Sequence, residues 1–211
     1  MTKIVLVRHG HVEGIAPERF RGRAELPLTE LGRRQAALAA ERIASAWPLA
    51  AIYTSPMGRC VETGRPIAAR TGAPAEASEL LNDLDYGAWT WKTYEEVSAA
   101  EPELFRRWFD APQLVRFPGG ESLQDLVSRT ADAVRQVIDA QPDQVVVLVA
   151  HDSVNRAMLL QLLDQPLSAY WRLAQSPCAI SEIDVVDGRI KVQRINDTAH
   201  LDAAPSRAAE S

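Results

Sequence analysis

Short apolar runs alternate with amphipathic segments along the chain. The β-branched run Lys3–Val7 predicts a first strand, and Ala51–Thr54 predicts a second. Val145–Val149 is apolar at every position, which is typical of a central parallel strand that is covered on both faces. Two further runs, Ile180–Val186 and Arg189–Ile195, flank an Asp-Gly turn signal and therefore predict a hairpin.

Helical patterns follow most of these strands. Thr29 is a favoured N-cap residue for a helix that extends to about Ser45, and the helix after Ser55 and Pro56 should end near Gly72. We expect further helices at about 94–101, 103–109, 122–140 and 154–163. This alternation predicts an α/β fold, namely a three-layer α/β/α sandwich with a mostly parallel central sheet.

The length and composition favour one domain with its own core. The chain has 211 residues, of which 46% are hydrophobic and 24% charged. We expect a single domain over residues 1–201, with a small cap insertion at about 84–118, where aromatic and turn residues are frequent. Residues 202–211 are small and polar, so we expect a disordered tail.

The charge pattern bears on partners and location. The formal net charge of −5 comes without a run of like charges, so we expect neither nucleic acid nor an anionic membrane as partner. No stretch reaches the roughly 18 to 20 apolar residues that a membrane span requires. Cys60 and Cys178 lack metal-ligand spacing, and the first residues do not form a secretory signal, so we expect a cytoplasmic protein with a small-molecule partner.

Polar residues whose side chains can take part in catalysis follow three of the predicted strands. Arg8 and His9 come directly after the first strand, Arg59 opens the helix after the second, and His151 follows Val145–Val149. Ligands of open α/β sheets bind outside the carboxyl ends of the strands. We therefore expect these four side chains to meet at one edge of the sheet.

This set of side chains suits attack on a phosphate. A neutral imidazole is a competent nucleophile near pH 7 that needs no metal, and His9 is the candidate. Guanidinium groups match the geometry of phosphoryl oxygens, so Arg8 and Arg59 would bind them, and His151 would donate to them as well. Asp83 is the candidate acid for the leaving alkoxide and the base for water in a second step.

Six segments carry a resemblance to a known family. They are LVRHG at 6–10, PLTELGRRQA at 27–36, SPMGRCVET at 55–63, LNDLDYGAW at 81–89, GGES at 119–122 and VAHDSVNRAML at 149–159. In order and spacing they resemble the histidine phosphatase (phosphoglycerate mutase-like) superfamily, and the NDTAHL ending resembles its phosphatase branch. The resemblance implies a phosphorylated nucleophile at His9, a phosphate pocket of Arg8, Arg59 and His151, and a proton donor at Asp83. It implies no metal and no other cofactor.

The chain departs from the family near the substrate. The family motif after His-Gly is usually Glu-Thr-x-x-Asn, but residues 11–15 read HVEGI, so a hydroxyl and an amide that often contact phosphate are missing. Arg21, directly before Gly22, is the candidate to compensate. The predicted substrate-binding residues are Arg21, Gly22 and Asp152.

The acid and the mouth of the site also differ from the family pattern. Asp83 stands where phosphatases of this branch commonly have Glu, and Asp85 is an alternative proton donor. Thr90 and Trp91 replace a common Glu-Gly pair, which predicts a narrower and more apolar mouth.

Three functions are compatible with these residues. A phosphatase of small phosphate monoesters is the leading interpretation. The alternatives are a phosphoglycerate mutase-type phosphoryl transfer and a catalytically inactive module that binds phosphorylated ligands. Arg106 and Arg107 could bind an anionic substrate tail or form a solvated helix face. The sequence does not identify the physiological ester, and the protein could be a monomer or a homodimer.

Overall fold

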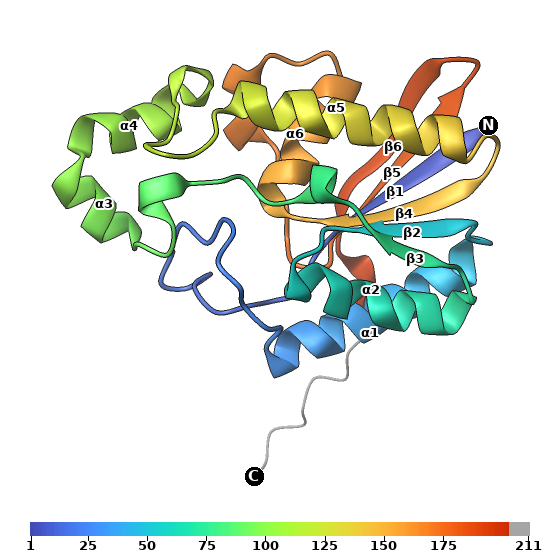
Figure 1. Cartoon of the computed structure of the whole chain (residues 1–211). Coiled ribbons are helices and arrows are strands. Elements are labelled where there is room, and N and C mark those ends of the chain that lie inside the picture. The colour runs from blue at the N-terminus through green and yellow to red at the C-terminus, as the bar shows by residue number, and fades with distance from the viewer. Residues whose placement is uncertain (203–211) are drawn as a thin grey trace, which may run out of the picture.

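The computed structural model describes residues 1–202, in which six strands form one sheet in the order β3-β2-β4-β1-β5-β6 (Figure 1). The strands are β1 (Thr2–Arg8), β2 (Ala51–Thr54), β3 (Ala75–Ala77), β4 (Val145–Ala150), β5 (Ile180–Val186) and β6 (Arg189–Asp197). Strands β1 to β4 run parallel, whereas β5 is antiparallel to β1 and β6 is antiparallel to β5. The mostly parallel sheet is as predicted.

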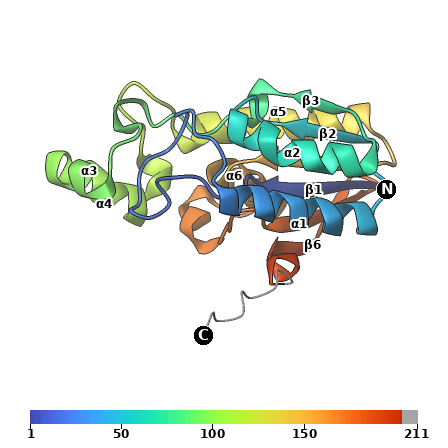
Figure 2. The same cartoon turned by 90° about the horizontal axis from the view of Figure 1, so that it is seen from below.

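Helices cover both faces of the sheet. They are α1 (Glu30–Ala46), α2 (Gly58–Thr71), α3 (Tyr94–Ala100), α4 (Pro102–Asp110), α5 (Leu123–Ala140) and α6 (Asp152–Leu162). Short 3₁₀ helices span Glu79–Leu81, Gly87–Trp89, Pro112–Leu114, Leu167–Arg172 and Ala199–Leu201. Helices α1 and α2 lie on one face, and α5 and α6 lie on the other (Figures 1 and 2). The three-layer α/β/α sandwich is confirmed.

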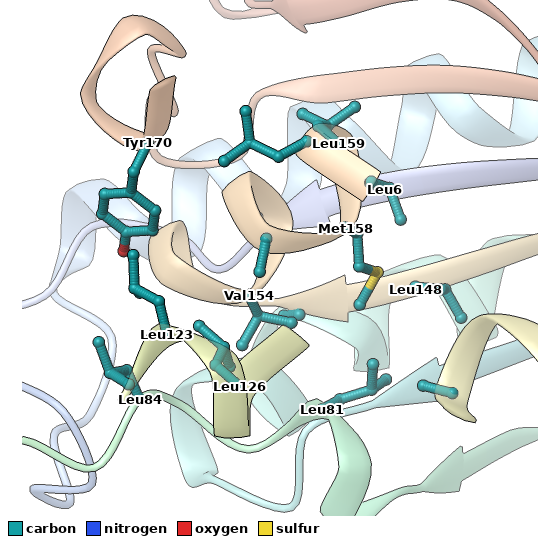
Figure 3. Close-up of a cluster of buried hydrophobic side chains, with 14 of the residues drawn as sticks. Leu6, Leu81, Leu84, Leu123, Leu126, Leu148, Val154, Met158, Leu159 and Tyr170 are labelled. Carbon is teal, nitrogen blue, oxygen red and sulfur yellow. The ribbon is translucent and has the colours of Figure 1, made fainter. Parts of the chain in front are cut away.

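Alternate residues of the central strands face opposite layers. Leu6 of β1 belongs to a buried cluster with Leu126 of α5 and Met158 of α6 (Figure 3). On the other face, the cluster joins Val5, Val7, Val147 and Val149 to Ala40, Ile43, Cys60 and Ile67 of α1 and α2. All of these side chains are fully buried. Two covered faces explain why Val145–Val149 lacks polar positions.

The segment expected to form a cap, residues 84–118, extends with α3 and α4 beyond the carboxyl end of the sheet (Figures 1 and 2). Aromatic rings join it to the rest of the chain. The ring of Phe20 lies 4.9 Å from that of Trp89 and 4.6 Å from that of Tyr94. The ring of Trp108 lies 5.3 Å from that of Tyr170. Such edge and tilted ring pairs stabilise a contact beyond the apolar area that they bury.

Several local boundaries differ from the expected ones. Strand β3 was not predicted, because Ala75–Ala77 reads AEA, is exposed and lacks β-branched or aromatic residues. Helix α6 begins at Asp152, directly after its N-cap His151, and not at 154. Apart from Asp202, the expected tail lies outside the described residues. Among residues 1–202, no helix is long and apolar enough to cross a membrane.

Candidate active site

Two histidines meet where β1 and β4 end. The parallel register pairs Arg8 with Ala150, so His9 and His151 each lie one residue beyond a paired position. The backbone N–H of His9 donates to the carbonyl of Ala150 at 2.9 Å. The two imidazole ring centroids are 5.3 Å apart. The structure thus brings together the two histidines that the sequence places at this edge.

The ring of His9 is held in one orientation. Its Nδ1 lies 2.8 Å from the carbonyl oxygen of Gly10 and can donate to it, which leaves the lone pair on Nε2. Burial, followed by the positive charges of Arg59 and Arg8 and the neighbouring His151, holds the pKa of His9 well below its usual value of 6.5. His9 is therefore neutral at physiological pH, with Nε2 able to attack an electrophile.

Two glycines allow the segment after His9 to lie close against α1. A Cβ on Gly10 would lie 2.5 Å from the carbonyl oxygen of Gly32, and a Cβ on Gly32 would lie 2.2 Å from the carbonyl oxygen of His11. The backbone N–H of Gly10 donates to Oγ1 of Thr63 on α2 at 3.0 Å. The loop after β1 is thus held against both α1 and α2.

Arg59, at the start of α2, is fully buried and links the site to two loops. Its Nε donates to Nδ1 of His151 at 3.2 Å, and its Nη2 donates to Oδ2 of Asp83 at 3.0 Å. Nη2 and Nη1 also donate to the carbonyls of Gly22 and Ala24, at 2.6 and 2.8 Å. One guanidinium thus fixes the relative positions of a histidine, a carboxylate and the loop that follows β1.

Arg8 and His151 complete the group of side chains at this edge of the sheet. Nη1 of Arg8 donates to the carbonyl of Gln175, and its Nε has no hydrogen-bond partner among the described residues. Burial lowers the pKa of Arg8, but a guanidinium stays charged near neutral pH. Burial, followed by the charges of Arg59 and Arg129, holds the pKa of His151 well below its usual value. An anion in the site would therefore meet charged arginines and neutral imidazoles.

Asp83, not Asp85, joins this group. Oδ2 of Asp83 lies 3.5 Å from Nδ1 of His151, and Oδ1 accepts from the hydroxyl of Ser153 and, at 2.9 Å, from the backbone N–H of Leu84. Asp85 instead accepts from the N–H of Gly87 at 2.8 Å. Of the two acids left open by the sequence, only Asp83 contacts the candidate site.

The predicted substrate-binding residues mainly contact other parts of the protein. Gly22, with φ of 43°, presents its carbonyl to Arg59. Nη1 of Arg21 donates to the carbonyl of Gly14 at 2.7 Å. Asp152 begins α6 and lies 2.5 Å from Nε of Arg156. The proposed roles of Arg21, Gly22 and Asp152 in substrate binding stay predictions.

Arg106 is exposed and lies 2.6 Å from Glu103, as expected for the solvated helix face. Among residues 1–202, no group of three His, Cys, Asp or Glu residues could hold a metal ion.

Sequence reasoning missed two residues that hold the candidate acid. Ser153 contacts its side chain, and Arg129 of α5 contacts its backbone, with Nη2 donating to the carbonyl of Asp83 at 3.0 Å. Ser153 lies two residues after His151, in the first turn of α6, and that position was the available signal. Arg129 had no signal, because an arginine in an amphipathic helix usually faces solvent.

The fold and the site define a class of protein, namely α/β sandwiches with a histidine- and arginine-lined site at the carboxyl ends of parallel strands. Residues 4–198 match the model of the histidine phosphatase superfamily (branch 1), and the chain belongs to this family.

The names of proteins similar to this chain give different activities. Phosphoserine phosphatase 1 of Hydrogenobacter thermophilus is 34% identical over 201 residues, which cover 95% of each chain. The probable phosphoglycerate mutase GpmB of Cronobacter sakazakii is 32% identical over 209 residues, which cover 96% of each chain. The solved structure of Bacillus stearothermophilus YhfR matches with a TM-score of 0.91 and 30% identity, covering 95% of this chain and 100% of that chain.

Proposed function

We propose that this protein is a phosphatase that hydrolyses small phosphate monoesters through a phosphohistidine on His9. One observation carries the proposal. The imidazole of His9 is buried and neutral, donates from Nδ1 to the carbonyl of Gly10, and has Nε2 available beside Arg8 and Arg59. Water needs an activating group to attack a phosphate, whereas this imidazole is a nucleophile without further activation.

In the first step, Nε2 of His9 attacks phosphorus while the bond from phosphorus to the ester oxygen breaks. The phosphoryl oxygens carry negative charge throughout, and Arg8 and Arg59 would bind them with charge-assisted hydrogen bonds. The leaving oxygen takes a proton from the carboxyl of Asp83, so an alcohol is released. The products of this step are the alcohol, phosphohistidine and the Asp83 carboxylate.

Substrate binding would change the surroundings of Asp83. In the structure, Nη2 of Arg59 donates to Oδ2 of Asp83. A phosphate dianion is a stronger partner for a guanidinium than one carboxylate, so it would take over this donor.

In the second step, the Asp83 carboxylate takes a proton from water while the water oxygen attacks phosphorus. The bond from phosphorus to Nε2 breaks, and inorganic phosphate leaves. His9 is neutral again and Asp83 is protonated again, so the cycle is closed.

Hydrolysis, and not return of the phosphoryl group, is the proposed main outcome. A mutase must exclude water from the phosphoenzyme and hold its substrate while the substrate reorients, which requires an extensive lid. Here only 35 residues separate Asp83 from Gly119. Because similar proteins are named as a phosphoserine phosphatase and a probable phosphoglycerate mutase, phosphoserine and phosphoglycerate are the first esters to test.

The test follows the phosphoryl group. The protein is incubated with phosphoserine, and separately with 3-phosphoglycerate plus catalytic 2,3-bisphosphoglycerate, while free phosphate and 2-phosphoglycerate are measured. Release of phosphate, with an acid-labile label that is lost in His9→Ala, supports the proposal. Isomerisation much faster than release would identify a mutase, and binding of phosphoserine without turnover would identify an inactive binding module.

A further inference from the structure

Arg129 binds the backbone of the segment that carries the candidate acid. It lies on α5, and only 15% of its side chain is exposed. Its Nη1 donates to the carbonyls of Leu80 and Asn82 at 2.9 and 2.6 Å, and its Nη2 donates to the carbonyl of Asp83 at 3.0 Å. A single guanidinium therefore holds three carbonyl groups in the four residues that end at the acid.

Glu121 orients this guanidinium, and both of its carboxyl oxygens accept hydrogen bonds. Its Oε1 accepts from Nε of Arg129 at 3.0 Å and from Nη2 of Arg23 at 3.1 Å. Its Oε2 accepts from Nη2 of Arg129 and from the backbone N–H of Asp85, both at 3.0 Å. Both carboxyl oxygens thus accept from two donors each, and one guanidinium binds both oxygens as a fork. Glu121 is therefore suited to hold Arg129 and Asp85 in place.

Arg129 and Glu121 hold the backbone around the acid, whereas Arg59 and Ser153 contact its side chain. The side chain of Asp83 contacts Arg59, Ser153 and the N–H of Leu84, whereas its carbonyl accepts from Arg129 and, at 3.2 Å, from Nε of Arg23. The side chain of aspartate has only one methylene between its Cα and its carboxyl. The reach of this acid therefore depends on where its backbone lies.

We propose that Arg129 and Glu121 are positioning residues that place the Asp83 backbone so that its carboxyl reaches the leaving oxygen. The proposal rests on the proposed function. Neither residue touches the site side chains His9, Arg8 or Arg59 in any hydrogen bond of the structure. Misplacement of a reacting group by about 1 Å can cost on the order of a hundredfold in rate, so loss of this support acts on proton transfer first.

The first test compares two esters that differ in whether the leaving oxygen needs a proton. Arg129→Lys keeps the charge but cannot replace a planar fork of five donors, and Glu121→Gln removes the charge that orients the fork. Turnover of phosphoserine should fall about tenfold in both variants, which is less than the roughly 10² to 10⁴-fold that would be lost with general acid catalysis altogether. Turnover of 4-nitrophenyl phosphate, whose phenolate leaves without a proton, should change less than about twofold.

The control variant is Arg135→Lys, also on α5, whose exposed side chain pairs with Asp132. This variant should leave the turnover of both esters unchanged. In the Asp83→Asn background, Arg129→Lys should cause no further loss with phosphoserine, because both changes remove the same proton transfer. Equal losses on the two esters, or an additional loss in the double variant, would overturn the positioning role.

A second measurement does not depend on turnover. Hydrogen exchange of peptides that span residues 79–86 should be faster in Arg129→Lys and Glu121→Gln, with exchange elsewhere unchanged. Exchange that rises throughout the protein, or not at all in 79–86, would overturn the proposal. If the unmodified enzyme releases no phosphate from either ester, the proposed function fails, and hydrogen exchange alone then decides whether this pair holds the Asp83 segment.

Discussion

Lowering the pH from 7.5 to 5.5 should reduce the free energy of unfolding through the two site histidines. Burial and nearby guanidinium groups hold the pKa values of His9 and His151 well below 6.5 in the folded protein. In this pH window the two rings bind fewer protons in the folded state than in the unfolded chain, whose histidines have ordinary pKa values. The unfolded state therefore gains protons as the pH falls, and the protein loses stability.

The magnitude follows from the unfolded pKa of about 6.5. At pH 5.5, protonation of each unfolded histidine stabilises the unfolded state by about 1.4 kcal/mol, and at pH 7.5 by less than about 0.1 kcal/mol. His9 and His151 together should therefore lower the free energy of unfolding by up to about 2.7 kcal/mol between pH 7.5 and 5.5. This is a large share of the ~5 to 15 kcal/mol that is typical of a folded domain.

Urea unfolding at the two pH values measures this difference, and equal m-values at both show that the unfolded ensembles are comparable. The double variant His9→Gln/His151→Gln should lose most of the pH dependence. His200, whose pKa is also lowered by burial, accounts for part of what is left. Free energies that agree within about 0.5 kcal/mol at pH 7.5 and 5.5 in the unmodified protein would refute the lowered pKa values of the two buried imidazoles.

Three further predictions concern the acid, the turn after the nucleophile and the aromatic cluster. Asp83→Asn should slow phosphoserine hydrolysis at least about a hundredfold and 4-nitrophenyl phosphate hydrolysis far less, as measured by phosphate release; equal losses would move the proton donor elsewhere. Gly10→Ala should lower stability in urea by at least about 2 kcal/mol, because its Cβ would lie 2.5 Å from the carbonyl oxygen of Gly32; an unchanged midpoint would contradict the close approach. Trp108→Ala should cost about 3 to 5 kcal/mol of stability in the same assay, because the ring is fully buried; a loss below about 1 kcal/mol would show that it does not hold the 84–118 segment.

The layers of the fold were predictable because a strand that is buried on both faces has an uninterrupted apolar sequence. Val145–Val149 is apolar throughout, and the structure places it between two helical layers. Strand β3 has no such apolar run. Its three exposed residues pair with β2 through backbone groups alone, and backbone pairing does not depend on side-chain identity.

The meeting of distant residues at the candidate site was predictable once the strands and their parallel direction were predicted. His9 and His151 follow strand ends, and parallel strands bring their carboxyl ends together. The choice between Asp83 and Asp85 was not predictable, because both lie in one irregular segment with no periodicity. That choice depends on contacts with Arg59 and Ser153, which are distant in sequence.

The register between β1 and β4 has a consequence for how substrate preference can diverge. Six consecutive backbone pairs, ending at Arg8 with Ala150, determine the distance between the two histidines. The 84–118 segment contributes no residue to this ladder, and its ring contacts are with Phe20 and Tyr170, which lie outside the ladder. We predict that replacing that segment changes substrate preference while the imidazoles keep their spacing, because surface segments vary more readily than the register of a buried sheet.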